Sequence, residues 1–419
     1  MPAQRVLSFA FQALLLLYGA VFFTFDRMLN LLPLVLLLAS FVFIAKQGKS
    51  IRGQFSREEL WISGTLVFYF LSFLLGFVVH SEQVSLLEEP VKFLFFSLII
   101  LFLSRMPFRI EYFWGMVAIA SISNLVYALW SGGNYNFEGR LSTDVFEHPL
   151  YYGNVSLLFG FVSLAGTIWA QGLQAKAKWG WSIFLLLGFL AGVMISILSG
   201  SRGGWVAIPF TLFFVLFHFA KIYQKQALLY WGAAAFVILI TLFVLFFDTP
   251  FQHRVLLTIQ SLQSYFLEDD PNTSLGLRFE MWQLGWRLFL ENPLLGFGEV
   301  NYLPELQRLI REAAITPELI HYEHLHNQYL QALAFHGVVG FIALVVMMWA
   351  FLRFFSKRLV SCNLEVKSLA VAGAVSVFLY LDFFLSITMF HLNQSTMPFL
   401  ILMALMTGKL LSINRMAAS

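Results

Sequence analysis

Apolar runs of about twenty residues recur through most of the chain, and they limit its fold more than any other feature. A helix needs roughly 20 apolar residues to cross a bilayer. An apolar fraction of 59% and a mean hydropathy of +0.77 are typical of a polytopic membrane protein. The candidate spans are 7–25, 28–45, 60–79, 91–104, 111–130, 150–170, 181–199, 203–220, 228–247, 327–352, 368–388 and 395–413. The sequence therefore predicts an all-α protein with about 12 transmembrane helices.

The distribution of charge predicts how the helices are oriented. Lys and Arg collect on the cytoplasmic side of short loops. With the N-terminus inside, seventeen of the 26 basic residues fall in cytoplasmic segments, and most acidic residues fall outside. We therefore expect both termini in the cytoplasm and residues 248–326 outside it. The first apolar run lacks a small-residue cleavage site, so we expect a retained helix rather than a signal peptide.

Three regions follow from this topology. Residues 1–247 are expected to form nine transmembrane helices, 248–326 an outer loop domain, and 327–419 three further helices with a cytoplasmic C-terminus. Within the loop domain, apolar periodicity predicts a helix over 278–290, which we expect along the membrane surface because tryptophan suits the headgroup layer. A second helix is expected over about 304–314.

Composition argues against several classes of function. The basic residues are scattered among loops, so nucleic acid is not an expected partner. The single cysteine, Cys362, cannot form an internal disulfide. No internal repeat is evident, and Asp382 is the one carboxylate clearly within a span, which argues against an ion-coupled carrier.

Two arginines occupy positions where a cation is costly. Arg202 follows Ser199-Gly-Ser at the outer end of two apolar spans, where it needs solvent or an anion. It either reaches lipid phosphates from a tight turn or binds an anionic ligand. Arg278 begins the predicted interfacial helix, where the dipole disfavours a cation. It either pairs with Asp269 or Asp270, or forms with Arg202 a clamp for a diphosphate, since guanidinium binds phosphate oxygens in a fork.

Histidines precede the tenth apolar run. His321, His324 and His326 with Glu323 could bind a metal, but their spacing is irregular, and we expect no metal. His326, at the entry to the run, is better interpreted as a general base or hydrogen-bonding group for an acceptor hydroxyl.

Other polar residues are weaker candidates. Arg140 and His148 lie on an outer loop that could simply be solvated. The acidic residues 268–270 could hold a divalent cation but are more typical of a solvated loop. Asp382 is expected to pair with an arginine or to act on the histidine from inside the bundle.

Four segments together resemble the bacterial O-antigen ligase family, which shares a domain with O-antigen polymerases. They are Ser199-Gly-Ser-Arg-Gly-Gly204, Arg278 with Trp282, Glu291-Asn-Pro-Leu-Leu-Gly-Phe-Gly298 and His324-Leu-His-Asn-Gln-Tyr-Leu330. Their order and spacing carry the resemblance over roughly 190–335, while the outer spans agree only in number and topology.

The resemblance implies a metal-independent, inverting glycosyltransferase of the membrane-embedded GT-C kind, with a helical periplasmic domain, in the bacterial inner membrane. Such ligases transfer a preassembled glycan from undecaprenyl diphosphate to a sugar hydroxyl of lipid A-core on the periplasmic face, and need no cofactor. The essential arginines of the family fall on Arg202 and Arg278, and its essential histidine falls on His326. Arg140 and His324 are weaker correspondences.

Three alternatives stay open. An O-antigen polymerase would use a second lipid-diphosphate glycan as acceptor. A transporter or flippase would bind the diphosphate at Arg202 and Arg278 without cleaving a bond. A protein-glycosylating transferase would use a polypeptide acceptor.

Overall fold

Helices make up nearly all of the described structure. The computed structural model describes residues 2–47, 55–132, 134–135, 139–224, 232, 260–268 and 271–418. The α-helices are α1 (Pro2–Val21), α2 (Leu31–Gln47), α3 (Arg57–His80), α4 (Glu88–Leu103), α5 (Ile110–Trp130), α6 (Pro149–Ala170), α7 (Ala175–Leu198), α8 (Ala207–Tyr223), α11 (Gly276–Glu291), α12 (Tyr302–Arg311), α13 (Gln328–Ser356), α14 (Leu364–Phe383) and α15 (Asn393–Ala418). Short 3-10 helices are η1 (Asp26–Asn30), η3 (Val84–Leu87), η4 (Arg202–Trp205), η5 (Glu299–Asn301) and η6 (Pro317–His321).

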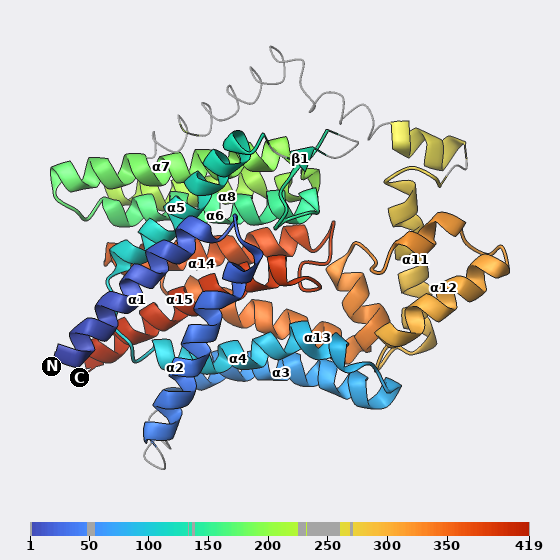
Figure 1. Ribbon diagram of the computed structural model, residues 1–419, viewed down its shortest axis with the longest axis horizontal. Helices are drawn as coiled ribbons and strands as arrows, with labels where there is room; N and C mark the ends of the chain where they lie inside the picture. Colours follow the sequence, from blue (N-terminus) through green and yellow to red (C-terminus); the bar gives the residue numbers. More distant parts are fainter. Residues whose placement is uncertain are drawn as a thin grey trace.

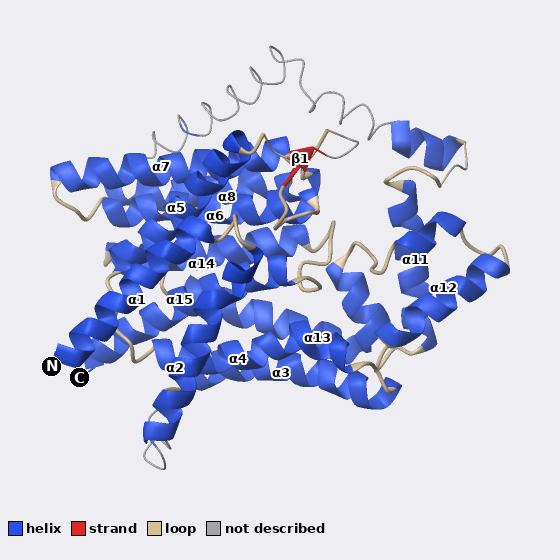
Figure 2. Ribbon diagram, viewed as in Figure 1, coloured by secondary structure: helices blue, strands red, loops and turns tan. Residues whose placement is uncertain are grey.

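The helical membrane class predicted from the sequence is confirmed. Among the described residues, nine helices are long and apolar enough to cross a membrane. Every predicted span except 228–247 coincides with a helix, and 228–247 lies outside the described residues. Two strands of two residues each, β1 (Asn134–Tyr135) and β2 (Leu141–Ser142), form the antiparallel pair visible in Figure 2. The total of 12 helices, the GT-C likeness and the sidedness stay predictions.

Helix α6 lies at the centre of the bundle, where every one of its residues is buried. A helix that is apolar all round belongs inside a larger assembly. Small residues let α6 and α7 approach closely, because a Cβ on Gly160 would lie 3.1 Å from the carbonyl oxygen of Phe189 and 3.3 Å from the Cα of Gly192. This rigid pair ends at the turn that carries Arg202.

Helices α11 and α12 form a smaller unit at one end of the bundle, opposite the end where the two termini lie (Figure 1). The apolar stripe predicted for α11 is confirmed, because Leu277, Met281, Leu284 and Leu288 are buried. They form a separate core with residues of α12 and with Ala334 and Phe335 of α13. Whether α11 lies on a membrane surface stays a prediction.

A kink at Gly337 fastens this unit to the bundle. Gly337 has a φ of 64° inside α13, a left-handed conformation that favours glycine. The kink frees backbone groups that pair with the loop after α11. Phe297 N–H donates to the Ala334 carbonyl at 2.7 Å, and Val338 N–H donates to the Pro293 carbonyl at 2.8 Å. The Gly296 and Gly337 backbones lie too close for a side chain on either residue.

Candidate active site

The turn that carries Arg202 is clamped between three helices. Gly200, with a φ of 63°, ends α7, and η4 leads into α8. Ser201 Oγ donates to Asn154 Oδ1 of α6 at 2.5 Å. A Cβ on Gly203 would collide with Ser386, and one on Gly204 with Asn154 and Phe383. The glycines of this segment are therefore needed for close packing. This packing holds the backbone of Arg202 in a defined position.

Arg140 lies beside the same turn. Its Nε would lie 3.5 Å from a Cβ placed on Gly200. The residues after Arg140 form β2 and then lead to His148, whose Nδ1 accepts a hydrogen bond from Leu150 N–H at the start of α6. The loop between α5 and α6 thus places Arg140 next to the turn of Arg202 and His148 at the start of α6.

Arg278 lies in the first turn of α11. Burial lowers the pKa of the Arg278 guanidinium, and the nearby positive charge of Arg202 lowers it further. Among the described residues no carboxylate lies within ion-pairing distance of Arg278. The alternative partners, Asp269 and Asp270, lie outside the described residues. The charge of Arg202 thus acts on Arg278 although the two residues belong to distant segments of the chain, and the diphosphate clamp stays a prediction.

His326 is held just before α13. Its φ of 49° is unusual for a residue with a side chain, and such strain of about 1–3 kcal/mol is most often found at functional sites. Asn327 caps α13 by accepting hydrogen bonds from Tyr329 N–H at 3.0 Å and Leu330 N–H at 3.1 Å. Gln328 accepts from Phe390 N–H at 2.9 Å. Strong local anchoring thus maintains the strained histidine.

The histidine rings form a row in which His326 is buried and His148 and His324 are half-buried. The His324 and His326 centroids are 4.3 Å apart, and the His148 and His326 centroids are 6.5 Å apart. The Nδ1 atoms of His324 and His326 are buried and have no hydrogen-bond partner within the described part of the chain. Both rings are within the influence of the Arg278 charge, and their Nδ1 atoms could hydrogen-bond a polar ligand.

Burial keeps both histidines neutral. It lowers the pKa of His326 far below its ordinary value, and His324, Arg278 and His148 lower it further. Burial, then His391 and His148, lowers the pKa of His324 to about 3. Neutral imidazole can accept a hydrogen bond from a hydroxyl group, which a doubly protonated ring cannot do.

Two further residues, His391 and Glu299, extend this row and were not predicted from the sequence as site residues. The His391 ring lies 5.4 Å from that of His324, and its Nδ1 lies 3.8 Å from Glu299 Oε1. Burial raises the pKa of Glu299 to about 7, with further contributions from the negative charges of Glu82 and Glu323. Glu299 directly follows the Gly298 that ends the third motif, which is the signal that could have drawn attention to it.

A cavity of about 330 Å³ begins at Glu299 and His391. Its polar lining combines carboxylates, amides and histidines, and its apolar lining includes Phe73, Phe390 and Leu392. Groups of this kind suit a ligand that carries several hydroxyls on an apolar ring face.

Other candidates are placed differently. Asp382 is buried, and its carboxylate accepts a hydrogen bond from Ala207 N–H at 3.1 Å, so it caps the start of α8 instead of pairing with an arginine in the described structure. His321 is exposed at the end of η6. Among the described residues, no three His, Cys, Asp or Glu side chains gather as a metal site. Of the acidic residues 268–270, only Glu268 is described, and it is exposed.

Fold and site together define a multi-pass membrane protein with a cationic, histidine-rich site at one end of its helices. Residues 185–345 match the family model described as O-antigen ligase. The match confirms, over these residues, the resemblance that the sequence motifs indicated. An uncharacterized protein of Haemophilus influenzae is 24% identical over 388 residues, which cover 92% of this chain and 94% of that protein.

Proposed function

We propose that this protein is an O-antigen ligase. It transfers a preassembled glycan from undecaprenyl diphosphate to a sugar hydroxyl of lipid A-core, on the periplasmic face of the bacterial inner membrane. The observation that carries this proposal is the electrostatic influence of Arg202 on Arg278 and of Arg278 on the buried ring of His326. The family match supports a reaction of the ligase or polymerase type.

The two arginines bind the diphosphate of the donor. Burial lowers the pKa of Arg278, and repulsion from the positive charge of Arg202 lowers it further. A diphosphate between them replaces this repulsion with charge-assisted hydrogen bonds. The same contacts strengthen as the leaving group gains charge, so they stabilise the transition state more than the bound substrate. Arg140, beside the turn of Arg202, is placed to support the same anion.

His326 receives the acceptor hydroxyl. The hydroxyl oxygen forms a bond to the anomeric carbon while the bond from that carbon to the phosphate oxygen breaks, and undecaprenyl diphosphate leaves with the electron pair. Attack from the face opposite the diphosphate inverts the anomeric centre. A bound diphosphate offsets the charge of Arg278 and so raises the pKa of His326 toward the range of a general base. The hydroxyl proton then passes to His326, and no metal is needed.

The cavity next to His391 holds the acceptor glycan. It joins the site through the rings of His391, His324 and His326, which meet edge to face. Its carboxylate and amide groups, including Glu299, Gln328 and Gln331, bind sugar hydroxyls. The lipid part of each substrate stays in the bilayer, so the reacting groups meet where the helices leave it.

Deletion of the gene tests the function. Lipopolysaccharide from a ligase mutant contains core without O-antigen on a gel, whereas loss of a polymerase leaves core with a single repeat. Purified protein with both lipid substrates distinguishes an enzyme from a transporter, because a transporter forms no product. Core with one repeat, or intact donor after incubation, would overturn the proposal.

A further inference from the structure

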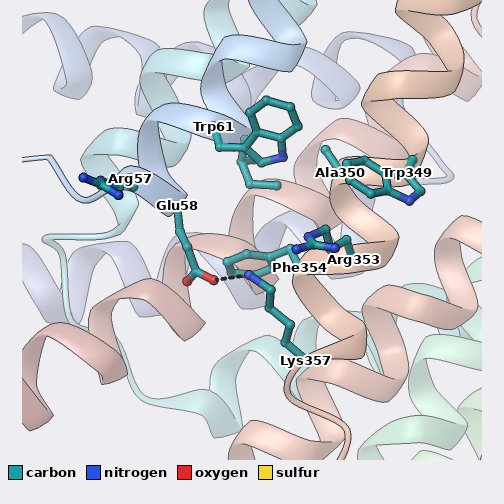
Figure 3. A pocket seen from close by; sticks show the side chains of 9 residues that line it. Arg57, Glu58, Trp61, Trp349, Ala350, Arg353, Phe354 and Lys357 are labelled. Atoms are coloured by element: carbon teal, nitrogen blue, oxygen red, sulfur yellow. Dashed lines mark hydrogen bonds and ion pairs between the residues drawn. The ribbon is translucent and has the colours of Figure 1, made fainter.

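A second cavity lies at the end of the bundle opposite the candidate active site. The candidate active site lies at the end of the bundle where α3 ends, at His80, and where α13 begins, after His326. The opposite ends of these two helices are Arg57 and Ser356. Between the start of α3 and the end of α13 is a groove of about 400 Å³. Figure 3 shows its lining residues: Arg57, Glu58, Trp61, Ile62, Trp349, Ala350, Arg353, Phe354 and Lys357.

Two tryptophans form the inner part of this groove. Trp61 and Trp349 meet edge to face with centroids 6.3 Å apart, and each is about half exposed. Their helices are both long and apolar enough to span a membrane. Tryptophan at the end of a membrane helix lies at the level of the lipid headgroups. The open side of the groove therefore faces lipid at the edge of the hydrocarbon layer.

Cations form the outer part. Arg57 lies four residues before Trp61, and Arg353 and Lys357 follow Trp349 at intervals of four, so each set shares a helix face. A spacing of four residues corresponds to about 6 Å along a helix axis. Both helices thus place an aromatic ring deeper and a cation about 6 Å nearer the water, which is the order of acyl chain and headgroup in a phospholipid.

The positive charge is only partly neutralised. Glu58 pairs with Lys357 at 3.3 Å and with Arg358 at 2.5 Å. Arg57 and Arg353 are exposed, and within the described residues neither has a carboxylate partner. Arg353 instead stacks on Trp349, with its Cζ 5.3 Å from the ring centroid. The groove therefore has two guanidinium groups available to an anion.

We propose that this groove binds an anionic phospholipid. The headgroup lies at the cationic rim of the groove, which Arg57 and Arg353 help to line, and the acyl chains follow Trp61, Trp349 and Ile62 toward the bilayer centre. A soluble anion would bind the arginines but would make no apolar contact with the half-exposed tryptophans. A phospholipid contacts the arginines through its headgroup and the tryptophans through its acyl chains. Basic clefts between membrane helices are recognised sites for acidic headgroups.

Native mass spectrometry of the full chain tests this site. Protein in detergent is titrated with phosphatidylglycerol and, separately, with phosphatidylcholine. Wild-type protein is expected to prefer phosphatidylglycerol by roughly fivefold for each of the two arginines. Arg57→Gln/Arg353→Gln should bind the two lipids with similar affinity. Arg57→Lys/Arg353→Lys keeps the charge and should retain most of the preference.

A matched control separates this site from general surface charge. Arg109 is an exposed arginine beside the first turn of α5 that pairs with Glu111, and Arg109→Gln should leave the lipid preference unchanged. The proposal is overturned if Arg57→Gln/Arg353→Gln retains the wild-type preference, or if Arg109→Gln abolishes it equally. Displacement of phosphatidylglycerol by millimolar inorganic phosphate would assign the groove to a soluble anion instead. Helical circular dichroism confirms that each variant is folded.

Discussion

The pKa of the Arg278 guanidinium in α11 is lowered by burial and, beyond that, by the positive charge of Arg202 at the turn after α7. Like charges that meet in a partly buried site raise the free energy of the empty protein. They persist only where the surrounding structure fixes them or where an anion binds between them. Here both segments are fixed by packing, Arg202 through its clamped turn and Arg278 through the apolar stripe of α11.

Neutral replacement of Arg278 should weaken donor binding. Loss of a charge-assisted contact to phosphate costs about 1.5–3 kcal/mol, so Arg278→Gln should lower the affinity for a polyprenyl diphosphate by about 10- to 150-fold. Equilibrium binding to purified protein measures the effect. Arg287 is a matched control, because it lies on the same helix with an exposed side chain beside Glu291. Equal affinities for Arg278→Gln and Arg287→Gln would show that Arg278 does not bind the diphosphate.

Removal of the His326 ring should affect transfer more than binding. A general base contributes about 10²–10⁴ in rate, so His326→Ala should reduce transfer by at least 10²-fold while the donor diphosphate still binds at Arg202 and Arg278. The turnover rate and donor affinity are measured on the same preparation. His321→Ala alters an exposed histidine of the same segment and should be fully active. Full activity of His326→Ala would remove the proposed role.

Much of the fold could be predicted because a segment that crosses the hydrocarbon layer has few possible backbone structures. A chain in lipid must satisfy its own backbone hydrogen bonds, so apolar length predicts helices directly. The stripe of Leu277, Met281, Leu284 and Leu288 was likewise readable, since a helix periodicity of 3.6 residues places them together. Arg202 and Arg278 could be predicted as candidate site residues because a cation at the edge of the membrane or at the start of a helix is energetically costly.

The other features of the site could not be predicted, because they depend on tertiary contacts between distant segments. Glu299 and His391 belong to different regions of the sequence, and they meet because α13 packs against α14 and its first residue, Gln328, bonds to Phe390 just before His391. Asp382 was expected to act on an arginine or a histidine, but its carboxylate caps α8. The start of a helix leaves N–H groups unsatisfied, and nothing near residue 382 in the sequence indicates that the start of α8 lies opposite.

Glu299 should make stability depend on pH. Its pKa is raised from 4.5 to about 7, so the folded protein holds a proton that the unfolded chain releases at lower pH. Stability is therefore lost as the pH rises from about 4.5 to about 7, by about 3 kcal/mol for this group alone. Glu299→Gln removes the penalty and should raise the apparent Tm relative to wild type at pH 8 but not at pH 4.5.

Thermal unfolding in detergent across this pH range tests the expected sign. Glu318→Gln replaces an exposed carboxylate of the same outer unit and should follow wild type at every pH. A Tm difference between Glu299→Gln and wild type that is constant with pH would mean that the carboxyl group of Glu299 does not titrate in this range.

Gly337 should be essential for joining the unit of α11 and α12 to α13. Its φ of 64° is costly for any other residue, and a Cβ there would collide with the Leu294 carbonyl. Gly337→Ala should therefore destabilise the protein by about 2 kcal/mol or more and displace the loop 293–298, which directly precedes Glu299. Gly64→Ala is the control, because Gly64 lies in α3 with open space around the position of a Cβ. Apparent Tm and limited proteolysis of this loop measure the two effects, and a Gly337→Ala protein as stable and protease-resistant as Gly64→Ala would show that the kink does not hold the outer unit in place.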